Sequence, residues 1–127
     1  MQIMQTTEFK ISKTAIPGLL EINVNSVEDN RGSFQEKFQK EKLVALGFPE
    51  SFLPVQHNVV FNKEKGVTRG LHAEPWDKYI SIISGKIFAA FVDLRPGENF
   101  GKKVTVEIDE KKAIFVPQGV ANSYQTL

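Results

Sequence analysis

The chain has 127 residues, of which 41% are hydrophobic and 24% are charged, close to the averages for a globular domain. This composition excludes a disordered tail, a collagen-like repeat and a coiled coil, and the length fits one domain better than two. Sixteen Lys and Arg against fifteen Asp and Glu leave a net charge of +1, which disfavours a nucleic-acid partner. The absence of cysteine excludes disulfides and cysteine-ligated zinc.

Short strands between turns account for most of the chain. Strands are predicted over 20–24, 33–39, 55–61, 67–72, 79–83, 87–94, 104–108 and 113–116. A turn is predicted at 29–32, where Asp, Asn and Gly tolerate turn geometry, and a hairpin is predicted around 84–86. One short helix is predicted over 40–46, because Gly47 and Pro49 follow it.

This pattern gives eight or nine strands at a spacing of about 8–12 residues, which is typical of an all-β sandwich or barrel. The missing crossover helices disfavour a doubly wound α/β fold. No apolar run approaches the roughly 18 residues that a membrane span needs. The segment Met1–Lys10 lacks the apolar region of a secretory signal, so we expect a cytoplasmic location and no membrane partner.

An unusually dense group of ionisable residues surrounds one of the two histidines, His72, between Arg69 and Lys78. Strand alternation places His72 and Glu74 on one face and Arg69 on the other. Lys78 directly precedes the strand predicted over 79–83 and would share a face with Ile80 and Ile82, so we expect a histidine and a lysine from neighbouring strands to meet inside a barrel. An imidazole can accept a proton at neutral pH, and an ammonium can stabilise an enolate oxygen. The alternative interpretation is a solvated loop after a strand.

Other chemistry finds less support in the sequence. His72 and Glu74 supply two metal ligands, but a barrel metal site would need a second histidine where Glu74 stands, so metal catalysis is disfavoured. No Gly-x-Ser-x-Gly, P-loop or dinucleotide-binding pattern occurs. At the predicted turn, Arg31, Phe34 and Glu36 could hold a phosphate, a base and a hydroxyl. The alternative there is a capped turn followed by an ordinary core phenylalanine.

Six segments, taken in order, point to a known family. They are Ile16–Leu20, Asp29–Glu36, Gln56–Asn58, Val67–Tyr79, Phe91–Arg95 and Val116–Tyr124. The most specific reads Arg-Gly-Leu-His-Ala-Glu-Pro-Trp-Asp-Lys-Tyr over 69–79. In these segments the chain resembles the dTDP-4-dehydrorhamnose 3,5-epimerases, cupin-like enzymes of dTDP-L-rhamnose biosynthesis.

The resemblance implies a cupin-type jelly-roll barrel of antiparallel strands as a single domain over 1–127, a homodimer, and neither a metal nor a cofactor. It also implies epimerisation at C3 and C5 of dTDP-4-dehydro-6-deoxy-D-glucose to give dTDP-4-dehydro-L-rhamnose. Family members continue past the position of Leu127, and that portion carries their acid tyrosine and the aspartate that orients the histidine. We therefore expect a chain shortened at its C-terminus, and whether Leu127 is its natural end stays open.

Residue roles follow from the same resemblance. His72 would be the base for both protons, and Lys78 would stabilise the enolate oxygen. The substrate-binding residues would be Arg31, Phe34, Glu36, Gln56, Asn58, Arg69 and Asn122. Arg31, Phe34 and Glu36 of one subunit would hold the thymidine diphosphate bound in the site of the neighbouring subunit. The resemblance puts both Arg69 and His72 in the site, although they have opposite parity on a regular strand, so a bulge or twist is expected near Gly70.

Two alternatives remain at this point. One is a dTDP-sugar 3,4-ketoisomerase, which is disfavoured because Glu74 stands where that family has a second histidine. The other is a truncated sugar-nucleotide-binding cupin without turnover.

Overall fold

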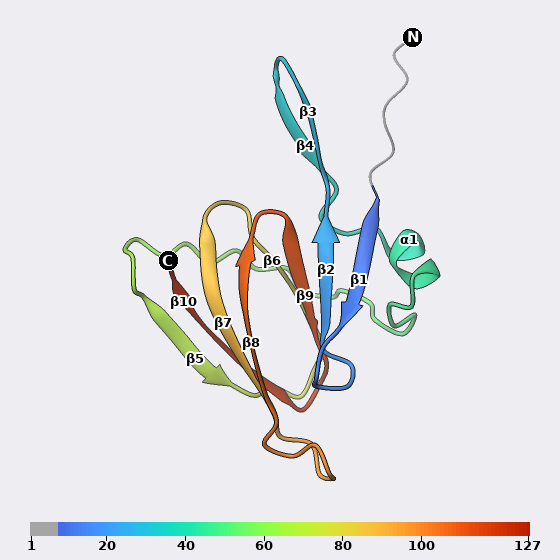
Figure 1. Ribbon diagram of the computed structural model, residues 1–127, viewed down its shortest axis with the longest axis vertical. Helices are drawn as coiled ribbons and strands as arrows, with labels where there is room; N and C mark the ends of the chain where they lie inside the picture. The colour runs from blue at the N-terminus through green and yellow to red at the C-terminus, as the bar shows by residue number, and fades with distance from the viewer. Residues whose placement is uncertain (1–7) are drawn as a thin grey trace.

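Two four-stranded antiparallel sheets form the body of the protein in the computed structural model, which describes residues 8–127 (Figure 1). The elements are β1 (Phe9–Lys13), β2 (Leu20–Val24), β3 (Ser26–Asp29), β4 (Gly32–Gln35), α1 (Lys40–Ala45), β5 (Thr68–His72), β6 (Lys78–Ser81), β7 (Lys86–Asp93), β8 (Lys103–Asp109), β9 (Lys112–Val116) and β10 (Val120–Thr126). The segment 1–7, on which the prediction about a secretory signal partly depends, lies outside the described residues. Among the described residues, no helix is long and apolar enough to cross a membrane.

The strand order is β1-β2-β9-β6 in one sheet and β5-β10-β7-β8 in the other. From β5 to β10 the chain passes from one sheet to the other between consecutive strands, except at β7 and β8, which pair within one sheet. Residues from both sheets therefore face the same interior. The alternation predicted for 20–24 is observed, because Leu20, Ile22 and Val24 are buried while Asn23 is exposed. The prediction of an all-β architecture with one short helix is therefore confirmed.

Two groups of apolar side chains fill the body. One lies where α1 packs beside β1, and it contains Phe9, Leu20, Ile22, Val24, Leu43, Phe48, Phe52, Ala113 and Phe115. The other lies between the two sheets, and it contains Ile16, Leu19, Ile87, Ala89, Phe91, Ile108, Ile114, Val116 and Val120. Several phenylalanines in the first group pack edge to face, with ring centroids 4.9 Å apart for Phe48 and Phe115.

The helix forms where the sequence predicts it. Gln39 has extended backbone geometry and its side chain accepts a hydrogen bond from the backbone N–H of Lys42 at 2.8 Å, which caps the helix at its start. The helix ends at Ala45, before Gly47, and buries Leu43 against the barrel.

Two expectations about strands are wrong. No strand forms over 55–61, and its apolar side chains are exposed, to 90% for Val55 and 84% for Phe61. β-propensity made the run a candidate, but none of the described strands pairs with it. The hairpin predicted around 84–86 is also absent, because β6 pairs with β9 while β7 pairs with β8 and β10. A glycine at a turn does not distinguish a hairpin from a connection between two sheets.

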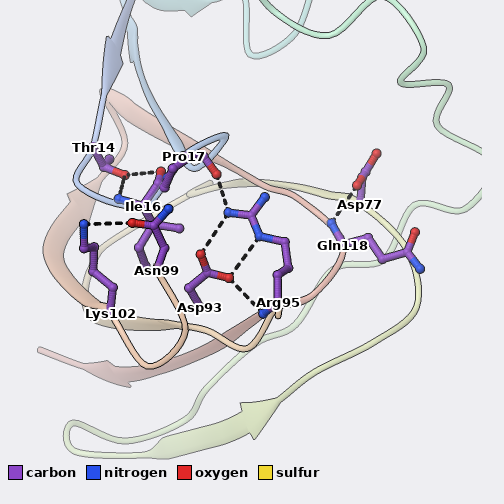
Figure 2. Close-up of polar contacts among 9 residues, drawn as sticks. All are labelled: Thr14, Ile16, Pro17, Asp77, Asp93, Arg95, Asn99, Lys102 and Gln118. Carbon is purple, nitrogen blue, oxygen red and sulfur yellow. Dashed lines mark hydrogen bonds and ion pairs between the residues drawn. The ribbon is translucent and has the colours of Figure 1, made fainter. Parts of the chain in front are cut away.

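A buried aspartate binds an arginine just beyond the end of β7 (Figure 2). Asp93, at the end of β7, accepts hydrogen bonds from the backbone N–H of Arg95 at 3.0 Å and from its Nε at 2.9 Å. Arg95 also donates to the backbone carbonyl of Pro17. Gly119 lies against this arginine, since a Cβ there would stand 2.6 Å from Arg95 Cγ. The pair thus joins β7 to two loops that are distant in the sequence.

Candidate active site

The strand that carries His72, β5, forms the edge of its sheet, and all five of its residues are exposed. It pairs with β10 irregularly: Asn122 lies opposite His72, and Tyr124 lies opposite Arg69. Between these pairs, one residue of β10, Ser123, stands against two of β5, Gly70 and Leu71, so β5 carries one extra residue there. The bulge predicted near Gly70 is confirmed, and it removes the parity conflict between Arg69 and His72.

Gly70 lies inside this irregularity, in a conformation that only glycine adopts easily. Its φ is +117°, and a Cβ there would lie 2.6 Å from Ser123 Cβ and 2.9 Å from the carbonyl oxygen of Asn122. The missing side chain thus lets β5 lie against β10 at this point. Because His72 is two residues further on, the glycine helps to set where the imidazole lies.

Asn122 is the residue that connects the strand of His72 with Lys78. β5 and β6 belong to different sheets, so the neighbouring strands expected from the sequence do not occur. Asn122 on β10 is opposite His72, and its Oδ1 accepts a hydrogen bond from Lys78 Nζ at 3.3 Å. Only 9% of Asn122 is exposed, so this contact crosses from one sheet to the other inside the barrel.

One acidic residue of the same segment binds Lys78, and another fixes the segment to the turn before β10. Its ammonium forms an ion pair with Glu74, four residues earlier. Asp77, the residue before it, accepts a hydrogen bond at 2.7 Å from the backbone N–H of Gln118, in the turn before β10 (Figure 2). The sequence marked Glu74 as a member of the ionisable group and as a disfavoured metal ligand, and it did not predict the contact with Lys78.

Arg69 is held by a residue that sequence reasoning missed. Its Nε donates to Asn62 Oδ1 at 2.7 Å, and Asn62 Nδ2 donates to the Tyr124 hydroxyl oxygen at 3.1 Å. Asn62 lies in the irregular segment before β5, where nothing in the local pattern marks it. Only the fold shows that this segment returns to β5 and β10.

Gln56 and Asn58 lie in the same irregular segment, and both are exposed. Gln56 Nε2 donates to Asn58 Oδ1 at 3.5 Å, the longest of these side-chain contacts. No bond from these two residues to His72, Lys78 or Asn122 is observed within the described chain.

The remaining predicted binding residues belong to a hairpin that projects from the barrel, well away from β5 (Figure 1). Arg31 pairs with Asp29 at 2.7 Å at its tip, and 50% of Phe34 is exposed, so the expectation of an ordinary core phenylalanine is wrong. Glu36 forms an ion pair with Lys42 of α1 at 2.7 Å. Within one chain, the structure does not bring these residues together with His72.

The base of this hairpin is fixed to the body. Lys37 Nζ donates to the carbonyl oxygens of Ile82 at 2.8 Å and Glu110 at 2.6 Å, and burial lowers the pKa of its ammonium. The Tyr79 hydroxyl donates to the Lys37 carbonyl at 2.6 Å, and burial raises the pKa of that hydroxyl. The hairpin therefore projects in a defined direction.

The arrangement suits proton transfer next to a carbonyl. Asn122, which lies opposite His72, binds the ammonium of Lys78. An imidazole can accept a proton, and an ammonium can stabilise an oxyanion. Within residues 8–127, no group of three or more potential metal ligands occurs.

Comparison with known proteins decides the family. The model of the dTDP-4-dehydrorhamnose 3,5-epimerase family matches residues 13–127. The chain belongs to this family. It is 54% identical over 116 residues to the "Protein RmlC homolog" of Streptococcus pyogenes, a match that covers 88% of the chain and 58% of the relative. The family resemblance predicted from the sequence is confirmed.

Solved structures of epimerase-family members show the same fold. The structure of RmlC from Streptococcus suis in complex with dTDP-D-xylose has a TM-score of 0.88 and 52% identity, over 97% of this chain and 64% of that one. The Bacillus anthracis 3,5-epimerase, with TDP and PPi bound, has a TM-score of 0.84 and 31% identity, over 94% and 71%. The cupin-type jelly-roll fold is therefore established, in a chain that spans about three fifths of its closely similar curated relative.

Proposed function

We propose that this chain binds a dTDP-4-dehydro-6-deoxy sugar and removes the protons beside its ketone, as part of dTDP-L-rhamnose biosynthesis. The observation that carries the proposal is the juxtaposition of His72, Asn122 and Lys78 across the two sheets. The names of the epimerase relatives, and the dTDP-sugar bound to the Streptococcus suis protein, support the substrate class.

In the proposed reaction, His72 takes the proton from C3 and later from C5 of dTDP-4-dehydro-6-deoxy-D-glucose. Both protons are α to the C4 ketone, so each abstraction leaves an enolate whose oxygen Lys78 stabilises. The ketone accepts the electron pair, so the chemistry calls on no cofactor. The proton bound by His72 passes to solvent, and a proton from solvent returns to the opposite face at both carbons, which gives dTDP-4-dehydro-L-rhamnose.

Solvent deuterium distinguishes this function from its alternatives. The full chain is incubated with the 4-dehydro sugar in D₂O, and C3 and C5 are followed by NMR. Deuterium at both carbons, with inversion, supports the 3,5-epimerase. Migration of the keto group would instead indicate a ketoisomerase, and tight binding of dTDP without exchange would indicate a binding protein. Either of these last two results overturns the proposal.

We also propose a homodimer in which the β3–β4 hairpin of one subunit reaches the site of the other. Arg31 and Phe34 are exposed on a projection that is anchored at its base by Lys37, so they cannot serve the His72 of their own chain in this arrangement. A cytoplasmic location stays a prediction.

Mixed subunits test this arrangement. His72→Asn and Arg31→Ala proteins are each weakened, but unfolding and refolding them together creates hybrid dimers in which one of two sites keeps both residues. About a quarter of wild-type activity should return, because half of the dimers are hybrids. No recovery, in a sample shown by light scattering to be dimeric, would contradict a shared site.

A further inference from the structure

Asn62 stands out in an otherwise exposed stretch of chain. Its neighbours Phe61 and Lys63 are exposed, whereas Asn62 is partly buried and uses both ends of its amide. Oδ1 accepts from Arg69 Nε at 2.7 Å, and Nδ2 donates to the Tyr124 hydroxyl at 3.1 Å. One side chain therefore joins the irregular segment to β5 and to β10.

The chemistry of the three groups fixes the direction of the amide. A guanidinium only donates hydrogen bonds, so the carbonyl end of Asn62 must face Arg69. A hydrogen bond to a charged group is stronger than one between neutral groups, so this contact holds the plane of the guanidinium. With Nε engaged, the outer edge formed by the two Nη groups is the edge that a bidentate oxyanion would meet.

Arg69 differs from the other two arginines of the chain in the charge of its partner. Arg31 is paired with Asp29 and Arg95 with Asp93, both of them carboxylates. Within residues 8–127, Arg69 forms no ion pair and is held by a neutral amide instead. An amide orients the guanidinium without cancelling its positive charge. The guanidinium therefore keeps the charge that attracts a diphosphate.

We infer that Asn62 is a positioning residue for nucleotide binding, which aims the Nη edge of Arg69 at the substrate's diphosphate while leaving its charge intact. Tyr124 holds the far end of the amide. The inference rests on the proposed function, and it adds that Arg69, a substrate-binding residue by the family resemblance, meets the diphosphate.

Three variants of the full chain separate orientation from charge. Asn62→Asp keeps both contacts, since a carboxylate accepts from Arg69 and from the tyrosine hydroxyl, but it adds a negative charge. Asn62→Ala removes both contacts, and Arg69→Ala removes the cation. Affinities for dTDP are measured by calorimetry and those for thymidine, which lacks phosphate, by NMR titration.

We expect Asn62→Asp to weaken dTDP binding about tenfold or more, and Asn62→Ala about threefold to tenfold, while thymidine binding stays unchanged. Adding Asn62→Ala to Arg69→Ala should cause no further loss, because the two residues act as one unit. Tyr124→Phe should have a smaller effect in the same direction.

The outcomes distinguish a failure of this inference from a failure of the proposed function. Equal losses for thymidine and dTDP would mean that Asn62 only supports the fold of its segment, which overturns the inference. Weaker binding by Arg69→Ala, with Asn62→Asp and Asn62→Ala unchanged, also overturns the inference but leaves the proposed function standing. Unchanged dTDP binding by Arg69→Ala would overturn the assignment of Arg69 itself.

Discussion

The protein contains the same Asp-x-Arg turn twice, in two different settings. In Asp29–Arg31 and in Asp93–Arg95, the arginine backbone N–H donates to the aspartate Oδ1, at 2.8 Å and 3.0 Å respectively. In both, the guanidinium also binds the carboxylate, with closest contacts of 2.7 Å and 2.9 Å. The local chemistry is thus almost identical.

The surroundings separate the two turns. The side chain of Asp93 is 2% exposed and its arginine also donates to the carbonyl of Pro17, whereas Arg31 is 76% exposed at the tip of the projecting hairpin. A buried pair is costly to break, while an exposed pair contributes little to stability and can exchange its carboxylate for another anion. The same motif can therefore be structural in one place and available for binding in the other.

The largest expected effect comes from Asp93→Asn. It removes the charge from a buried acceptor of three hydrogen bonds with Arg95, so the free energy of unfolding should fall by about 2–3 kcal/mol. Urea unfolding followed by circular dichroism measures the change. The matched variant Asp29→Asn should leave the midpoint unchanged, and a similar loss in both variants would contradict the contrast between the turns.

Gly119→Ala comes next. Its φ is +89°, and the new Cβ would lie 2.6 Å from Arg95 Cγ, so the substitution adds backbone strain and displaces the arginine. We expect a loss of about 2 kcal/mol. Gly32→Ala, beside Arg31, has φ +147° but no atom within 4 Å, so about 1 kcal/mol should be lost there from strain alone. Thermal melts of both proteins measure the two losses of stability. A larger loss in Gly32→Ala than in Gly119→Ala would contradict this contrast.

The acid limb of stability should also distinguish the turns. The hydrogen bond from Arg95 holds the pKa of the Asp93 carboxyl below its usual value of 3.8. A lowered folded-state pKa stabilises the protein above the unfolded pKa, and this contribution is lost as the pH falls below about 4. Asp93→Asn should therefore flatten the fall in unfolding free energy between about pH 4 and 2. The bond from Arg31 also lowers the pKa of Asp29, but solvent screens that exposed pair, so Asp29→Asn should keep most of the wild-type slope.

Arg31→Ala should have the smallest effect on stability and a selective effect on binding. We expect an unchanged urea midpoint and dTDP affinity weakened about tenfold, because an exposed guanidinium is lost from the proposed nucleotide site. Calorimetry with dTDP provides the measurement. A loss of stability without a change in affinity would assign this turn the structural role of its buried counterpart.

Much of the fold could be predicted from local patterns. The alternation of apolar and polar residues predicted the strands at 20–24 and 104–108. The glycine and proline that follow 40–46 predicted the helix. The predictions failed where the partner of a strand decides the outcome. Val55–Phe61 has strand-forming residues but no described strand beside it, and β1, β3 and β10 were not predicted from their own residues.

The site was predictable in its composition but not in its connections. The ionisable group around His72 was visible in the sequence, and the resemblance singled out Asn122. The contact of Asn122 with Lys78 joins segments more than 40 residues apart in the sequence. The contact of Asn62 with Arg69 depends on the path of an irregular loop. No local spacing predicts such contacts. The bulge at Gly70 was predictable, because two residues of opposite parity had to be reconciled.

The most direct test of the account compares the two histidines. Wild type, His72→Asn and His57→Asn are incubated with the 4-dehydro sugar in D₂O, and deuterium at C3 is measured by mass spectrometry. His57 is exposed and provides the matched control. We predict that His57→Asn exchanges deuterium at the wild-type rate. In His72→Asn the exchange rate should fall by at least about 100-fold. Exchange by His72→Asn at the wild-type rate would contradict the assignment of His72 as the base.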